Sequence, residues 1–108
     1  MNKINLNKMI GGWFIGNFEP SIHKTTDFEV GIKNYNKGEC VEKHFHKIAV
    51  EYTIIIEGEA IMNGIQYNAG EVIKVEPFEV SDFKAITEVK SVVVKIPSVI
   101  NDKYKVND

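Results

Sequence analysis

Glycine residues divide the middle of the chain into short segments, and this division restricts the fold more than any other feature of the sequence. Segments of about four to eight residues between turn residues suit β-strands. None of them carries an apolar repeat at helical spacing. We therefore predict an all-β domain, a sandwich or barrel of about seven or eight short strands. The dividing residues are Gly31, Gly38, Gly58, Gly64 and Gly70.

The predicted strands follow from alternation and from turn residues. Phe28, Val30 and Ile32 alternate with polar or small residues, with the period of two that a β-strand gives. Asn63 and Gly64 suit the positive φ angles of a type I′ turn, so a hairpin is expected around them. The predicted strands cover residues 28–32, 40–46, 49–57, 60–62, 65–67, 71–76, 80–85 and 91–96.

Composition and charge exclude several classes of protein. A chain of 108 residues with a net charge of -2 is expected to form one domain and not to bind nucleic acid. Its single cysteine, Cys40, allows no internal disulfide, which favours a cytoplasmic protein. There is no apolar run of the ~20 residues that a membrane span needs, and the polar N-terminus does not resemble a secretion signal. All 13 basic residues are lysines, so the bidentate guanidinium that holds phosphate is missing.

We assign a single domain to residues 1–108, with its core at about 28–96. Residues 1–27 are treated as an N-terminal arm and residues 97–108 as a C-terminal tail. The tail is expected to pack first along the barrel and then to enter solvent. The charges that indicate a solvated end are those of Asp102, Lys103 and Lys105.

Three isoleucines in a row interrupt the alternation of the strand at 49–57. A strand with one face in solvent alternates apolar and polar residues, so Ile54, Ile55 and Ile56 indicate that both faces are covered. The core covers one face. Either residues 12–15 or a second subunit covers the other, and we predict a homodimer whose interface includes this strand.

His44 and His46 lie two positions apart on a predicted strand, so both rings are expected on the same face. Glu51 follows five residues later and can face the histidines once Lys47 and Ile48 have made a turn. Two histidines and one carboxylate form the ligand set of many open metal sites, including those of non-haem Fe(II). The alternative is a surface histidine pair that binds no metal.

The stretch from Gly38 to Gly58 resembles the first conserved motif of the cupins, which reads G-x5-H-x-H-x3-4-E-x6-G. His44, His46 and Glu51 stand at its fixed positions with the expected spacing. The match is specific because every fixed position of the motif is met.

The second cupin motif, G-x5-P-x-G-x2-H-x3-N, is degraded. Gly70 and Pro77 are one residue further apart than the motif requires. Glu79 replaces the second glycine, Asp82 replaces the histidine and Ile86 replaces the asparagine.

The resemblance, which covers about residues 28–96, implies a double-stranded β-helix, a jelly-roll cupin barrel that holds one divalent metal ion (Mn, Fe, Ni or Zn). It implies His44, His46 and Glu51 as ligands, with Asp82 as the fourth in place of histidine. Two carboxylates make a hard ligand set, which favours Mn(II) or Fe(II) over soft metals. Asp82 has an alternative role as a solvated or turn-capping residue.

Four further residues are candidates for the site. By strand parity, Glu42 is expected on the face of His44 and His46, where it is a candidate general acid or base. Its alternative is a solvated strand residue. The candidate pocket walls are Tyr35, Thr53 and Phe83.

The resemblance favours a metal-dependent enzyme that acts on a small polar metabolite, as a sugar isomerase or epimerase, a lyase or a dioxygenase. The missing arginines count against a phosphorylated substrate. Two alternatives remain open. One is a barrel that binds a small ligand without catalysis, and the other is a structural, dimeric barrel whose metal site has degraded.

Overall fold

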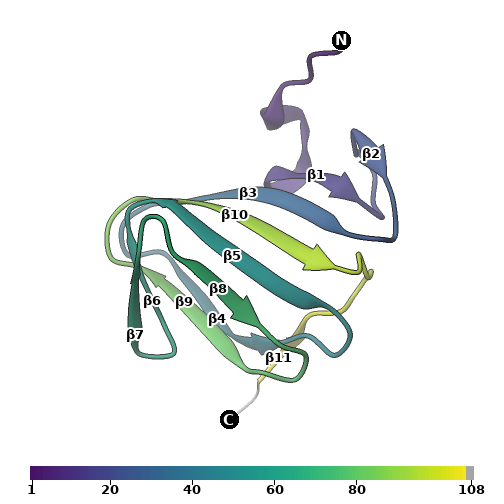
Figure 1. Cartoon of the computed structure of the whole chain (residues 1–108). Helices are drawn as coiled ribbons and strands as arrows, with labels where there is room; N and C mark the ends of the chain where they lie inside the picture. The colour runs from purple at the N-terminus through teal and green to yellow at the C-terminus, as the bar shows by residue number, and fades with distance from the viewer. Residues whose placement is uncertain (107–108) are drawn as a thin grey trace.

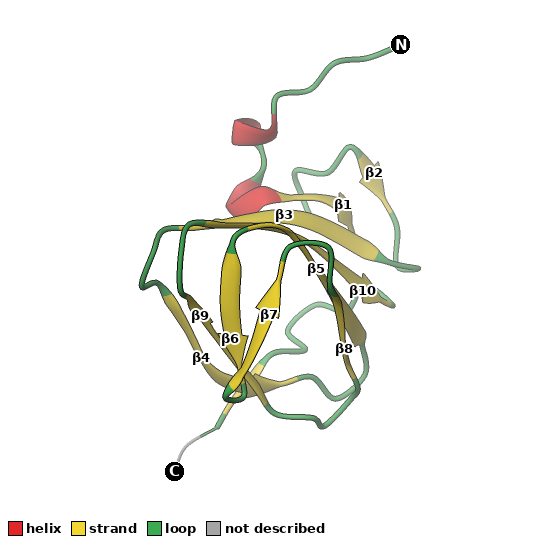
Figure 2. Cartoon of the chain, turned by 60° about the vertical axis from the view of Figure 1, so that its left-hand side comes forward, coloured by secondary structure: helices red, strands yellow, loops and turns green. Residues whose placement is uncertain are grey.

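The computed structural model describes residues 1–106, which form two β-sheets that face each other across a common interior (Figures 1 and 2). One sheet has six strands in the order β2-β1-β3-β10-β5-β8, and the other has five in the order β11-β4-β9-β6-β7. Two 3-10 turns, η1 (Leu6–Lys8) and η2 (Ile10–Gly12), precede the strands. The strands are β1 Trp13–Gly16, β2 His23–Lys24, β3 Glu29–Tyr35, β4 Cys40–Phe45, β5 Val50–Glu57, β6 Glu59–Met62, β7 Ile65–Asn68, β8 Val72–Val75, β9 Ser81–Ala85, β10 Val89–Ile96 and β11 Tyr104–Lys105.

From β3 onward the chain passes back and forth between the two sheets, with only the β6–β7 hairpin staying in one of them. This winding is the double-stranded β-helix, or jelly roll, that was expected. Each predicted strand is confirmed, with its ends within a few residues of the prediction. Among residues 1–106 there is no helix of the length and apolar character that a membrane crossing needs.

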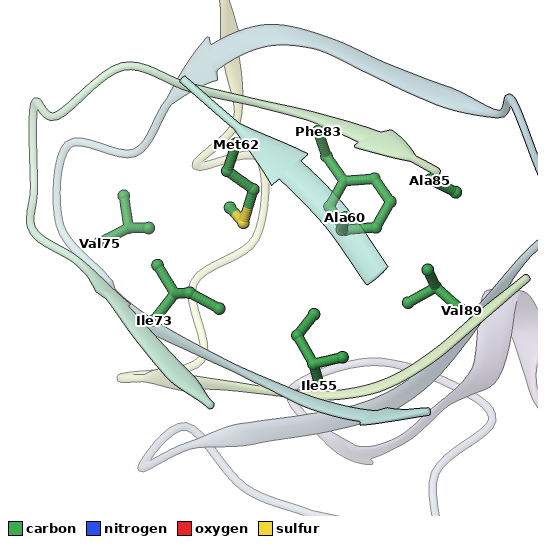
Figure 3. Packing of buried hydrophobic residues seen from close by; sticks show 8 residues of the cluster. All are labelled: Ile55, Ala60, Met62, Ile73, Val75, Phe83, Ala85 and Val89. Atoms are coloured by element: carbon green, nitrogen blue, oxygen red, sulfur yellow. The ribbon is translucent and has the colours of Figure 1, made fainter. Parts of the chain in front are cut away.

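The hydrophobic core lies between the sheets (Figure 3). Alternation on β5 points Ile55, which is fully buried, at the facing strands β6 and β9. The central strand β10 pairs with both β3 and β5, which makes the six-stranded sheet a continuous wall for the core. The core residues are Ile55, Ala60, Met62, Ile73, Val75, Phe83, Ala85 and Val89.

The N-terminal arm is shorter than predicted, because residues 13–24 contribute two strands to the six-stranded sheet. In this added part, β1 pairs antiparallel with β3, and Trp13 lies opposite Gly31. A Cβ at Gly31 would come within 2.6 Å of the Trp13 ring, so the glycine makes room for the indole. The places of β1 and β2 depend on pairing with β3 and with each other, which the sequence pattern does not display.

The prediction of a solvated C-terminal charge cluster is wrong for Asp102. Its carboxylate is buried and accepts hydrogen bonds from the backbone N–H groups of Lys47, Ile48 and Ala49, at 2.9–3.3 Å. Burial alone would raise the pKa of Asp102, but the bonds from Ala49, Lys47 and Ile48 outweigh it and lower that pKa below its usual value. The tail is therefore fixed to the β4–β5 turn, which carries His46 at one end.

The outer face of β5 is only partly covered within this chain. Ile55 is buried inside, whereas Ile54 is half-buried and Ile56 is 47% exposed. In register, Ile54 lies between Val92 of β10 and Val72 of β8, which is 60% exposed. Residues 12–15, the other candidate cover, lie at β1, and both β3 and β10 stand between β1 and β5 in the sheet. Phe14 lines a groove with Ile32 and residues of the N-terminal segment.

Candidate functional site

A cavity of about 320 Å³ opens between the two sheets, beside the core. Inner-face residues of β3, β5, β9 and β10 line most of it. Tyr35, Thr53 and Phe83, the predicted pocket walls, line this cavity together with His44 and Glu51. The two-residue period of the strands places these side chains inside, as it does the core residues.

His44, on β4, is buried at the wall of the cavity. Its Nδ1 lies 2.9 Å from the backbone carbonyl oxygen of Glu42. A carbonyl only accepts hydrogen bonds, so Nδ1 carries a proton and donates it to Glu42. A histidine oriented in this way by a carbonyl at one nitrogen is prepared to bind a metal ion through the other.

His46 follows directly after β4 and is 2% exposed. Its ring centroid lies 5.3 Å from that of His44, with the two planes nearly perpendicular at 81°. Burial, with smaller effects of Lys95 and His44, lowers the pKa of His46 to about 4. The ring is therefore neutral at physiological pH, and its buried Nε2 has no hydrogen-bond partner among residues 1–106.

Glu51 is buried on the inner face of β5, where it lies in register between Lys95 of β10 and Val75 of β8. After burial itself, the charge of Glu51 is the main cause that raises the pKa of Tyr35. A protonated phenol and a carboxylate thus share the wall of one cavity.

Asp82 lines the same cavity, but its carboxylate has a structural partner. Oδ1 accepts a 2.7 Å hydrogen bond from the backbone N–H of Asn63, and the N–H of Asp82 donates to Oδ1 of Asn63 at 3.1 Å. These reciprocal bonds join the β6–β7 turn to β9. They correspond to the turn-capping role that the sequence left open for this residue.

The four predicted metal ligands do not converge on one point. In the part of the chain described here, no three His, Cys, Asp or Glu side chains stand close enough to hold a metal ion. The chemistry of the donors nevertheless fits a divalent ion, because the His46 imidazole is neutral and its buried Nε2 lacks, within residues 1–106, a partner that an ion would supply.

Glu42 does not share the face of His44, and its predicted placement is wrong. The pairing of β4 with β9 shifts between Val41 and His44, so an extra residue of β4 breaks the two-residue parity. The Glu42 side chain is 81% exposed and lies 3.8 Å from Lys105. Glu42 contributes to the site through its backbone carbonyl, which orients His44.

Sequence reasoning missed the end of the cavity formed by Trp13, Lys33, Lys95 and Lys103. Lys33 and Lys95 approach the Trp13 ring, with Nζ at 5.4 Å and 5.1 Å from its centroid. The alternation of β10 carries the signal for Lys95, since Ser91, Val93 and Lys95 share one face. Trp13 carries no such signal, because its place depends on the long-range pairing of β1 with β3.

Comparison with solved structures agrees with this architecture. A double-stranded β-helix protein of Klebsiella pneumoniae is 22% identical, with a TM-score of 0.70 over 78% of this chain and 74% of that one. A cupin superfamily protein of Desulfitobacterium hafniense is 14% identical, with a TM-score of 0.63 over 68% and 71%. The chain has the cupin fold. No protein-family model matches the chain, and no curated protein matches it.

Similar cupin structures include enzymes. The nucleoside dehydratase Pac13 of Streptomyces, whose structure has also been determined with uridine, is 14% identical to this chain. Its TM-score is 0.68, over 77% of this chain and 71% of that one. At such identities the likeness concerns the fold.

Proposed function

We propose that this cupin is a metal-dependent enzyme that acts on a small polar metabolite, in an isomerase, lyase or dioxygenase type of reaction. One divalent ion (Mn, Fe, Ni or Zn) is held by His44, His46 and Glu51, with Asp82 as the fourth ligand. The observation that carries the proposal is the buried Nε2 of His46, which has no hydrogen-bond partner within residues 1–106. His46 lies beside His44, and His44 lines the cavity together with Glu51.

The residues of the chain prepare this cavity for polar chemistry. The Glu42 carbonyl orients the His44 ring through Nδ1, and burial keeps His46 neutral. Tyr35, whose pKa is raised, stays protonated and can donate a hydrogen bond to a substrate oxygen. A divalent ion in this place acts as a Lewis acid toward substrate oxygens or, if it is iron, permits chemistry with O₂.

The size of the cavity supports a small substrate. Its volume of about 320 Å³ lies near the lower end of the ~300–1,000 Å³ typical of small-molecule sites. The dehydratase with the same fold supports an enzymatic role for a barrel of this kind.

A second candidate function is a binding or structural barrel without catalysis. The bond of Asp82 to Asn63 and the unconverged ligand set favour it. In this alternative the replaced residues of the second cupin motif are the remains of a lost metal site.

Metal analysis separates these functions. Protein purified without added metal, and protein equilibrated with Mn(II), Fe(II), Ni(II) or Zn(II), is expected to hold about one ion per chain. His44→Ala and Glu51→Ala should lose it, and His23→Ala, at an exposed histidine outside the cavity, should keep it. Absence of bound metal under all conditions would support the structural barrel. Screens for O₂ uptake and for sugar epimerisation then address the reaction type.

We further propose that two copies pair through the outer face of β5 in the cytoplasm. Ile32, Val92, Ile54 and Val72 form an apolar row across β3, β10, β5 and β8. A second copy is the favoured partner because a two-fold contact places the same apolar row on both sides. The exposed, single Cys40 suits a reducing compartment.

A further inference from the structure

The cavity has a positively charged end, which the metal-dependent chemistry does not use. The lysine cluster at this end consists of Lys33, Lys95 and Lys103, and all three residues line the cavity. Lys33 is on β3 and Lys95 on the neighbouring β10, whose register brings both to the inner face. Lys103 follows Asp102, whose three backbone hydrogen bonds fix this part of the tail against the barrel.

Trp13 forms the floor between two of these lysines. Its ring fills the space left by Gly31, at the point where a Cβ would meet it at 2.6 Å. The Nζ atoms of Lys33 and Lys95 lie 5.4 Å and 5.1 Å from the ring centroid. Two ammonium groups therefore lie near one aromatic ring at this end of the cavity.

The positive charge of the lysine cluster is not balanced by an ion pair. Within residues 1–106, no carboxylate lies within 4.0 Å of any of its three ammonium groups, although three other lysines have such partners. Lys33 donates only to the backbone carbonyl of Gly11, at 2.7 Å. Burial, and then the charges of Lys95 and Lys103, lower the pKa of Lys33, because a nearby positive charge disfavours the protonated ammonium group.

We propose that the lysine cluster and Trp13 bind the carboxylate of a small organic acid, whose other polar groups reach His44 and Glu51 in the same cavity. An anion relieves the repulsion among the lysines, and the indole face contacts the carbon chain of the acid. The substrate class of the proposed enzyme is then a small hydroxy or oxo acid, an inference that rests on the proposed function. The carboxylate site itself needs no metal.

A singly charged carboxylate fits this end better than a phosphate dianion does. Glu51 is buried opposite Lys95 in the register, so a carboxylate of the chain already offsets part of the positive charge at this end. The chain also has no arginine to hold a phosphate in a bidentate manner.

Trp13 is the single tryptophan of the chain, so its fluorescence reports on this site alone. Metal-free, chelator-treated protein is titrated with pyruvate, lactate, malate and gluconate, and with inorganic phosphate and glucose as comparators. At least one carboxylate should change the emission in a saturable way. Binding should weaken at least ten-fold in Lys33→Gln and in Lys95→Gln, recover in part in Lys33→Arg, and persist in Lys37→Gln, an exposed control.

Four outcomes overturn the carboxylate site: no carboxylate changes the emission, phosphate alone does so, glucose binds equally well, or Lys33→Gln and Lys95→Gln bind as the parent does while circular dichroism shows them folded. His44→Ala separates this inference from the proposed function. Carboxylate binding should persist at least in part in this variant even though it loses the metal, because the lysine cluster is intact. A parent protein that binds the carboxylate but takes up no metal keeps the anion site and contradicts the proposed enzyme.

Discussion

At the scale of single residues, one side chain of the site is oriented by a neighbour in the sequence and the adjoining turn is held by a distant residue. The ring of His44 is oriented by a carbonyl two residues away, but Asp102 holds the turn after His46 from more than fifty positions along the chain. Residue types and spacing predicted the histidine pair because their chemistry is local. They could not predict the buried carboxylate of Asp102, because a charged residue near a polar chain end is typical of a segment exposed to solvent.

Asp102→Asn should lower the free energy of unfolding by about 1–3 kcal/mol, because it removes the charge from three backbone hydrogen bonds in a buried place. Urea denaturation measures the change. Asp27→Asn, at an exposed aspartate, is the control and should stay within about 0.5 kcal/mol of the parent. An Asp102→Asn variant as stable as this control would contradict the structural role of Asp102.

The contribution of Asp102 to stability should depend on pH. Its pKa is lower in the folded chain than in the unfolded chain, where it is about 3.9. The stabilisation is therefore present above about pH 4 and is lost as the pH falls through the lower, folded value. Thermal unfolding at about pH 7 and pH 2.5 should show the gap between parent and Asp102→Asn closing at the lower pH. A gap of equal size at both values would be inconsistent with this linkage.

At the scale of elements, the sequence predicted the strands β3 to β10 and missed β1, β2, β11 and the bulge within β4. Alternation and glycine turns are local signals, so β3 to β10 could be recognised. The β-bulge in β4 leaves no such signal, and it turned Glu42 outward. Likewise, β1, β2 and β11 depend on pairing with distant strands, which a single sequence does not display.

The backbone conformation and the surroundings of Gly58 favour glycine at the last position of the first cupin motif. Its φ is +92°, and a Cβ there would stand 2.1 Å from the carbonyl oxygen of Glu88. Gly64 has a similar φ of +78° with no atom within 4 Å of its Cβ position. Gly64→Ala should therefore cost about 1–2 kcal/mol for backbone strain alone, and Gly58→Ala about 3 kcal/mol or more. Equal losses in chemical denaturation would show that close approach does not matter at Gly58.

At the scale of the whole molecule, the six-stranded sheet has an inner wall at the cavity, where we propose chemistry, and an outer apolar face, where we propose association. The outer apolar row of Ile32, Val92, Ile54 and Val72 is continuous across four strands. The inner wall of the same sheet carries Glu51 and Lys95. A single sheet thus serves both proposed roles, and each can be changed separately by substitutions on one face.

The homodimer is tested by the mass in solution. Light scattering at micromolar concentration should give twice the chain mass, and Ile54→Lys should give a monomer because it places a charge in the apolar row. Ile65→Lys, at an isoleucine that is 57% exposed on the other sheet, is the matched control and should remain dimeric. A parent protein with the mass of one chain would contradict the proposed homodimer.

The central claim is that His44, His46 and Glu51 hold one metal ion, and anomalous diffraction tests it most directly. Crystals grown with Mn(II) should show one strong anomalous peak in the cavity, at about 2.0–2.3 Å from Nε2 of both histidines and from a Glu51 oxygen. The same data show whether the Asp82 carboxylate gives up its hydrogen bond with Asn63 and binds the metal ion as a fourth ligand. A cavity without such a peak, or peaks only at surface groups such as His23, would contradict the metal site and favour the structural barrel.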